Sequence, residues 1–235
     1  MKKLHLALTA FLGTALAFNT ALARDRDLVS ETRELGTFNK IVLNGSADVN
    51  IVVGGAQSVE VWTESEYLDR VETEVRGNTL YISQEGRRWR SVDVTLEISV
   101  EDLNGITIKG SGDFDITNLD SESFEIIIKG SGDVDVSGKS ASFNVYIQGS
   151  GDIDLSGGCG SMDVEVDGSG DVDASNLTCE NVDLTLDGSG DIDVYASKSL
   201  IVNMEGSGDV TIYGDPDRFR PRMKGSGSID FVDEN

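Results

Sequence analysis

The stretch KGSGDFDI at residues 109–116 returns almost unchanged as KGSGDVDV at residues 129–136. The corner GSGD begins at Gly110, Gly130, Gly149, Gly168, Gly188 and Gly206, with a degenerate GSGS at Gly225 and a looser GSAD at Gly45. The steps of about 18 to 20 residues are typical of solenoids in which each repeat forms one coil. The repeat therefore predicts a chain built from stacked copies of one small unit.

Two short alternating stretches flank each corner. In the segment VDLTLDGSGDIDVY at 182–195, apolar and polar side chains alternate before the glycines and again after them. A period of two indicates a β-strand with one buried face. Each unit therefore predicts two strands joined by a glycine corner, because glycine reaches positive φ without a Cβ clash and lets neighbouring coils approach closely.

Two all-β folds fit this pattern. In a parallel β-helix, equivalent residues of successive coils stack about 4.8 Å apart, whereas in an antiparallel meander GSGD would form a hairpin turn at one end of every strand pair. A meander has no need to copy its unit so closely. The sequence favours a right-handed parallel β-helix with coils of about 19 residues, since parallel crossovers are overwhelmingly right-handed.

The two ends of the predicted helix depart from the repeat. Residues 24–105 suggest a divergent coil at 41–53, strands at 58–63 and 78–83, and a short helix within 66–75. Solenoids need atypical terminal units, so this segment is expected to contribute divergent coils and a cap. Regular repeats are expected over 106–213, which makes residues 24–235 one β-helical domain.

A second cap is expected over residues 214–235. Its expected core residues are Phe219, Met223, Ile229 and Phe231. The same segment holds a basic cluster formed by Arg218, Arg220, Arg222 and Lys224. This cluster is expected either to be solvated and locally paired or to act as a docking patch.

The first 23 residues have the pattern of a secretory signal peptide. Lys2 and Lys3 precede an apolar run that closes on Ala21-Leu22-Ala23, and the run is too short for a membrane span. We expect cleavage before Arg24 and export to the periplasm, the outer surface or the medium. No integral membrane segment is expected in the mature chain.

The chain is strongly acidic. Its formal charge is -23, and loss of Lys2 and Lys3 with the signal peptide leaves -25. This charge disfavours nucleic acid and anionic lipid as partners and favours cations, basic surfaces or neutral glycans. The only histidine, His5, lies in the signal peptide, so the mature protein has no imidazole for catalysis or metal binding.

The order of these segments resembles a known family. The opening FNKIVLNGSADVNIVVG, the segment SVEVWTESEYLDRVETEVRGNTLYIS and the run LNGITIKGSGD are similar to the auto-transporter adhesin head GIN domain family of bacterial exported proteins, over residues 38–220. The resemblance implies a β-helical domain in the cell envelope or at the surface, with an adhesive role. The sequence shows no autotransporter barrel after the repeats.

Stacked coils would align the repeated aspartates in two columns. One would hold Asp113, Asp133, Asp152, Asp171, Asp191 and Asp209, and the other Asp115, Asp135, Asp154, Asp173 and Asp193. Carboxylates so close repel unless they accept hydrogen bonds, bind protons or hold cations. One interpretation is structural, with turn bonds and a solubilising surface. The other is a Ca²⁺ site at Asp171, Asp173, Asp191 and Asp193, where no lysine precedes the corner.

The two cysteines lie one repeat apart. Cys159 and Cys179 would therefore fall on adjacent coils, and an exported protein meets an oxidising compartment. A disulfide is the expected arrangement, with two free thiols as the alternative.

The leading functional hypothesis is a non-catalytic, adhesin-like module that presents an acidic repetitive surface to glycans or cell-surface proteins. A structural or stress-related envelope protein is the alternative. A polysaccharide-active enzyme is third, because glycoside hydrolysis needs two carboxylates with separated pKa values and these carboxylates recur identically in every coil. Aromatic residues that would stack on sugars if exposed, but are expected in the core or cap, are Trp62, Trp89, Tyr81, Tyr146 and Tyr195.

Overall fold

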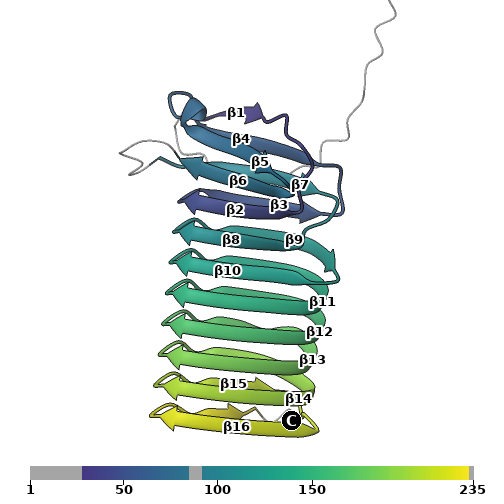
Figure 1. The fold of residues 1–235 in the computed structure, drawn as a ribbon, viewed down its shortest axis with the longest axis vertical. Coiled ribbons are helices and arrows are strands. Elements are labelled where there is room, and N and C mark those ends of the chain that lie inside the picture. The colour runs from purple at the N-terminus through teal and green to yellow at the C-terminus, as the bar shows by residue number, and fades with distance from the viewer. Residues whose placement is uncertain (1–27, 85–91, 233–235) are drawn as a thin grey trace, which may run out of the picture.

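The computed structural model describes residues 28–84 and 92–232, and these form a stack of coils with two long parallel sheets (Figure 1). We call the sheet whose strands run into the glycine corners the leading sheet, and the sheet whose strands follow the corners the trailing sheet. The predicted parallel β-helix is confirmed. Strands that lie wholly in the leading sheet are β6 (Thr79–Gln84), β2 (Lys40–Gly45), β8 (Gly105–Gly110), β10 (Phe124–Gly130) and β16 (Arg218–Gly225). Those in the trailing sheet are β7 (Thr95–Val100), β3 (Asp48–Val53), β9 (Phe114–Ser121), β15 (Val210–Tyr213) and β17 (Ile229–Phe231).

Four long strands contribute to both sheets. They are β11 (Val134–Gly149), β12 (Ile153–Gly168), β13 (Val172–Gly188) and β14 (Ile192–Gly206). Each begins after a corner in the trailing sheet, bends through the second linkage and ends at the next corner in the leading sheet. In Figure 1 the chain runs along the leading sheet to a corner, crosses behind and returns one level further from β1, which makes the helix right-handed.

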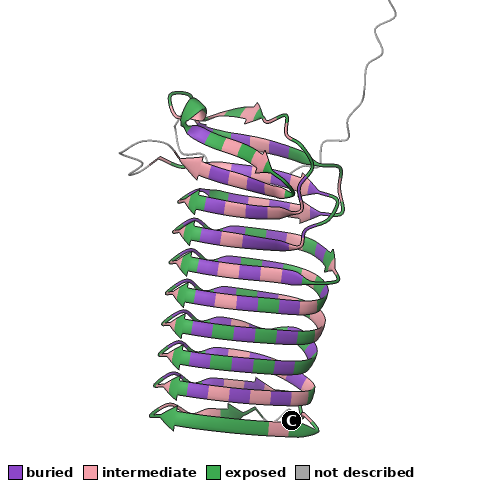
Figure 2. Ribbon diagram, in the orientation of Figure 1, coloured by how far each residue is buried: buried purple, intermediate pink, exposed green. Residues whose placement is uncertain are grey.

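The core fills the space between the two sheets. Alternate residues of every regular strand are buried and the others face solvent, as Figure 2 shows along the stack. In register, Phe124 stacks on Phe143, and the two rings meet edge to face with their centroids 6.1 Å apart. Continuous apolar columns therefore run along the axis, and they stabilise the coils by burying apolar surface.

The corner glycines are required by the close stacking of coils. Gly149 has φ +143°, and a Cβ there would lie 2.1 Å from the carbonyl oxygen of Gly130. At Gly151 a Cβ would lie 2.2 Å from the carbonyl oxygen of Gly132. Each corner thus rests directly on the backbone of the preceding corner, where no side chain fits.

The N-terminal coils do not stack in chain order. The coil formed by β2 and β3 lies between the coil of β6 and β7 and the coil of β8 and β9. Three antiparallel strands complete this end: β4 (Ser58–Glu64) pairs with β7, β1 (Leu28–Thr32) pairs with β4, and β5 (Val71–Arg76) pairs with β6. The helix expected within 66–75 is a three-residue 3-10 turn, η1 (Leu68–Arg70), because β5 begins directly after it at Val71.

The C-terminal coil of β16 and β17 differs from the expected cap. Met223 is 48% exposed and Phe231 is 46% exposed, while Phe219 and Ile229 are partly buried. The prediction that these residues form the core of a cap is therefore wrong for Met223 and Phe231, whereas Phe219 and Ile229 do pack against the core. All four occupy core positions in the last coil, but the described chain places nothing beyond them.

Among the described residues, no helix has the length and apolar character needed to cross a membrane.

Candidate binding faces of the solenoid

The first aspartate column is a ladder of hydrogen bonds between coils, which we call the corner ladder. The backbone amide of Asp171 donates to Oδ1 of Asp152 at 2.9 Å, and the amide of Asp191 donates to Oδ1 of Asp171 at 2.7 Å. The same bond recurs at every regular corner from Asp113 to Asp209. These carboxylates thus satisfy the backbone of the next coil, which supports the structural interpretation of this column.

The corner ladder extends into both degenerate corners. It starts at Asp48 of the GSAD corner, whose carboxylate accepts the amide of Asp113. It ends at the GSGS corner, where the amide of Ser228 donates to Oδ1 of Asp209 at 2.7 Å. In the described chain no later coil needs an acceptor from position 228, so serine replaces aspartate there.

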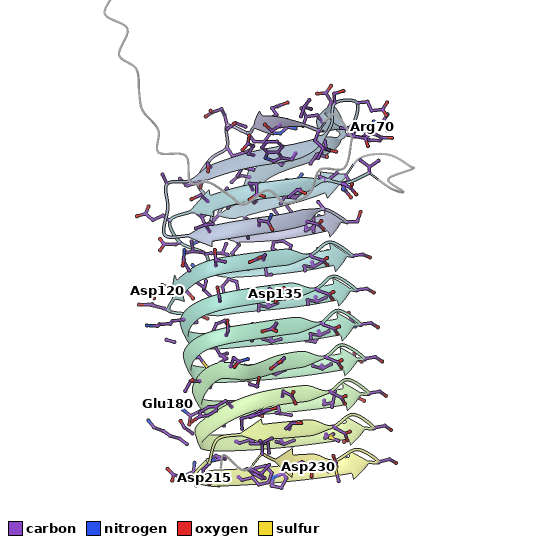
Figure 3. All side chains as sticks on the ribbon, turned by 180° about the vertical axis from the view of Figure 1, so that it is seen from behind. Arg70, Asp120, Asp135, Glu180, Asp215 and Asp230 are labelled. Atoms are coloured by element: carbon purple, nitrogen blue, oxygen red, sulfur yellow. A yellow bond between two sulfur atoms is a disulfide. The ribbon has the colours of Figure 1, made fainter. Side chains whose placement is uncertain are left out.

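The second column lies on the outward face of the trailing sheet, and we call it the outer column. Its members are Asp115, Asp135, Asp154, Asp173 and Asp193, in register on consecutive strands. Figure 3 shows Asp135 near the middle of this face. Asp173 accepts hydrogen bonds from the amide and the hydroxyl of Ser175. Within the described ranges, no basic side chain forms an ion pair with any of the five.

One member of the outer column, Asp135, has a raised pKa. Partial burial raises the pKa of Asp135 above its usual 3.8, and the charges of Asp154 and Asp115 raise the pKa further. Asp133 and Asp113 of the corner ladder act in the same direction. A shallow groove lies between the two columns, lined by residues such as Asp133, Asp135, Asp152 and Asp154. A cation in this groove would lower the repulsion.

The four residues predicted for Ca²⁺ lie at adjacent positions of the two columns. Asp171 and Asp191 each use one oxygen in the corner ladder, and Asp173 bonds Ser175. The side chains described here contain no group of three or more His, Cys, Asp or Glu residues arranged to hold a metal ion. Calcium binding at this place stays a prediction.

A disulfide joins Cys159 and Cys179 on adjacent coils. The two residues are in register on β12 and β13, with their Cα atoms 4.6 Å apart. Cys179 is fully buried, and Cys159 packs partly against the core. The bond lies in the second linkage, where the strands bend and the register between β12 and β13 shifts.

The described members of the aromatic set lie on the outer faces, so none of them is a core residue, although Trp62 belongs to β4 at the N-terminal end, where a cap was expected. Trp62 is 38% exposed. Tyr81 and Tyr146 face outward from the leading sheet, each with a cation over its ring: Arg76 over Tyr81 and Lys129 over Tyr146. Tyr195 is partly buried on the trailing sheet beside Tyr213. Trp89 lies outside the described residues.

A polar groove on the edge opposite the corners was not predicted. Its lining includes Lys40, Asp102, Asp120, Glu122 and Glu125, and Nζ of Lys40 lies 3.3 Å from Oε2 of Glu125. Sequence reasoning missed it because β2 stacks on β8, which brings Lys40 beside strands that follow much later in the chain. No local residue pattern predicts this groove; in the structure, Asn118 of β9 has a φ of 59°, which marks an irregular linkage.

Comparison with protein families gives one match over most of the chain. Residues 37–216 match the family described as "Putative auto-transporter adhesin, head GIN domain". The matched range includes both aspartate columns and the disulfide. No curated protein sequence matches the chain.

Solved structures share the whole fold. The crystal structure of "a putative adhesin" from Bacteroides fragilis is 26% identical, has a TM-score of 0.81, and the match covers 87% of this chain and 97% of that one. A "putative lipid binding protein" from Parabacteroides distasonis is 25% identical with a TM-score of 0.68, over 88% and 97% of the two chains. Another "putative adhesin" from Parabacteroides distasonis, at 20% identity and a TM-score of 0.66 over 88% and 98%, shares the fold.

Proposed function

Because the chain belongs to the auto-transporter adhesin head GIN domain family, we propose that it is an exported, non-catalytic binding module of the adhesin type. The names of the family and of the Bacteroides fragilis structure support adhesion as the class of function. The same family name supports export, and the predicted signal peptide, which lies outside the described residues, supports release into the periplasm or beyond.

The outer column is the observation that carries the proposal. Five aspartates stand in register on one face of a rigid sheet, and the described chain supplies them with no cationic partner. Like charges held in such a column repel, and the charges of Asp154 and Asp115 add to the burial that raises the pKa of Asp135. A basic patch on a cell-surface protein would relieve this repulsion on docking, and the fixed spacing of the coils would give many weak contacts at once.

The adhesion test compares two variants of the mature chain, residues 24–235. The column variant carries Asp115→Asn, Asp135→Asn and Asp154→Asn. The control carries Asp163→Asn, Asp167→Asn and Asp187→Asn, which remove the same charge from the leading sheet. Labelled proteins are titrated onto whole cells, a glycan array and neutral lipid vesicles, at low and high salt.

We expect saturable binding of the wild-type chain and the control to cells, weakened by salt, and at least about tenfold weaker binding of the column variant. Equal binding by the two variants would place adhesion on another face. Absence of any binding by the wild-type chain would contradict the proposed function. Binding to vesicles alone would favour a lipid-binding role.

Calcium at Asp171, Asp173, Asp191 and Asp193 is a separate proposal for the same face. Ca²⁺ takes several carboxylate oxygens, and each of these residues has at least one oxygen that the hydrogen bonds described above do not use. Calorimetric titration tests it. Saturable binding that is lost in Asp171→Asn with Asp191→Asn would support the site, and no heat at millimolar Ca²⁺ would contradict it.

A further inference from the structure

The last coil exposes side chains that continue the buried columns of the stack. Met223 is in register with Met204, which is 1% exposed, and Phe231 is in register with Ile212, which is fully buried. Met223 and Phe231 themselves are nearly half exposed. Figure 2 shows this coil as the most exposed of the stack. The interior of the solenoid is therefore open at this end.

Exposed apolar side chains gather at the two ends of the molecule. The large hydrophobic residues exposed within the described ranges are Leu28, Trp62, Met223, Phe231 and Val232. Leu28 and Trp62 belong to β1 and β4 at the N-terminal end, and the other three to the last coil or the residue after it. The regular coils between the ends expose none, so the apolar surface suited to docking is axial.

The edge strand of the last coil is basic on an acidic molecule. Arg218, Arg220, Arg222 and Lys224 occupy the outward positions of β16, and all four are exposed. Lys224 pairs with Glu205 of the preceding coil, while the described residues give the three arginines no ion pair. Three guanidinium groups therefore remain for a partner.

The opposite end of the same sheet carries two exposed carboxylates. The strand β5 pairs with β6 and with no other described strand, and its exposed outward residues are Glu72, Glu74 and Arg76. Arg76 pairs with Glu74 along the strand, and Glu72 accepts a hydrogen bond from the hydroxyl of Ser83, so docking would exchange or share these exposed contacts. The strand pairings connect each outward position of β5 to one of β16 through every strand of the leading sheet. Glu74 begins the outward column that ends at Arg222, and Glu72 begins the column that ends at Lys224. Acidic and basic side chains thus terminate the same columns at opposite ends.

We propose that this chain associates head to tail, with β16 and β17 of one copy docked on β5 and β1 of the next. Stacking along the axis would bring Arg222 and Lys224 toward Glu74 and Glu72 of the second copy and would cover Met223 and Phe231. Two C-terminal ends placed together would oppose their basic rows, which disfavours a symmetric dimer. A contact between unlike ends repeats without closing, so it produces linear oligomers.

Pro221 limits backbone pairing at this contact. Proline has no amide hydrogen, so an added strand cannot pair continuously along β16. Charged side chains and proline on edge strands are also the features that limit uncontrolled strand addition. The association therefore rests on charge pairs and apolar side chains, and it weakens as salt screens the charges.

Sedimentation velocity on the mature chain at low salt tests the proposal, with two end variants. The tail variant carries Arg222→Glu and Lys224→Glu, and the head variant carries Glu72→Lys and Glu74→Lys. A control carries Lys109→Glu and Lys129→Glu in the middle of the stack, which matches the charge change of the tail variant. All substituted side chains are exposed, and circular dichroism checks that each variant folds.

We expect concentration-dependent oligomers for the wild-type chain and the control, and monomers for each end variant alone. In an equal mixture of the two end variants, the native tail of one meets the native head of the other, and the exchanged tail meets the exchanged head. The mixture should therefore form alternating oligomers although neither variant associates alone. A variant that combines all four changes should regain oligomers. A wild-type chain that stays monomeric at about 1 mM would overturn the proposal, as would oligomers unaffected by the head variant. Cell binding by a monomeric variant would leave the proposed adhesion intact, which separates the two outcomes.

Discussion

At the scale of single residues, the corner assigns different tasks to neighbouring positions. The two glycines allow contact between the backbones of successive coils, and the serine amide at Ser150 donates to the carbonyl oxygen of Gly130. The aspartate accepts the next coil's amide, as Asp171 does. These contacts explain why GSGD is repeated, because each corner needs the same backbone and carboxylate groups at the matching position of the preceding coil.

Replacing a corner glycine tests this account. Gly149→Ala places a Cβ 2.1 Å from the carbonyl oxygen of Gly130 at a residue with φ +143°. The backbones must separate, and we expect a loss of more than about 3 kcal/mol in the free energy of unfolding. Gly158→Ala is the matched control, since its nearest atom beyond the chain neighbours is 3.9 Å away. We expect that change to cost less than about 1 kcal/mol in urea denaturation. Equal costs would contradict the packing role of the corner.

The corner ladder predicts opposite effects of two substitutions at one position. Asp171→Asn keeps an oxygen that accepts the amide of Asp191 and removes one charge from the column, so stability should be unchanged or higher. Asp171→Ala removes the acceptor and should cost about 1 kcal/mol. Urea denaturation in chelator measures both. If the two variants are equally destabilised, the carboxylate contributes through its charge instead of through the bond.

Sequence reasoning identified both aspartate columns but not their different tasks. Period two and the repeat place Asp113 and Asp115 on separate columns, and like-charge repulsion follows from the spacing alone. The bond from the amide of Asp133 to Oδ1 of Asp113 depends on the geometry of the corner, which no local pattern of residues reports.

At the scale of elements, the regular coils were predictable and the ends were not. Strands such as β12 and β13 repeat one pattern, so their parallel register follows from aligning the corners. The coil of β2 and β3, in contrast, stacks between coils that come later in the chain. The antiparallel pairings of β1 with β4 and of β5 with β6 were likewise not predicted. Where the repeat has diverged, the sequence no longer shows which strands pair, so the stacking order of these coils could not be predicted.

The disulfide fixes two adjacent coils at the second linkage. The bond closes a loop with a sequence separation of 20 residues, and the loop-entropy model gives about 3 kcal/mol for such a loop. Cys159→Ala with Cys179→Ala should therefore lower the melting temperature by roughly 6 to 12 °C for a domain of this size. Differential scanning calorimetry measures the shift, with reduced wild-type protein as a second route to the same state. An unchanged melting temperature in both would show that stacking alone holds these coils.

At the scale of the whole molecule, excess negative charge sets the dependence of stability on pH. The pKa values of Asp48, Asp135 and Asp183 are raised from 3.8, chiefly by burial and then by neighbouring aspartates. Stability from these groups is fully present below pH 3.8 and is lost as pH rises through their raised pKa values. Glu74 and Glu205 act oppositely, because ion pairs with Arg76 and Lys224 lower their pKa values below 4.5, but both are fully exposed and their pairs are weak.

The melting temperature at low salt should therefore fall as pH rises from 3.8 through the raised pKa values of these three aspartates. The exposed pairs of Glu74 and Glu205 oppose this fall only weakly. Added salt should reduce the slope, because it screens the repulsion between carboxylates. A melting temperature that rises over this window would mean that other groups dominate the titration.

We propose that the outer column is kept for binding at a cost in stability, while the corner ladder holds the coils together. The most direct test is the melting temperature of the column variant, Asp115→Asn with Asp135→Asn and Asp154→Asn, against the wild-type chain at pH 7 and low salt. Asparagine preserves side-chain size and removes three repelling charges, so the account predicts a higher melting temperature for the variant. A lower melting temperature would contradict the claim, because it would show that these carboxylates stabilise the fold.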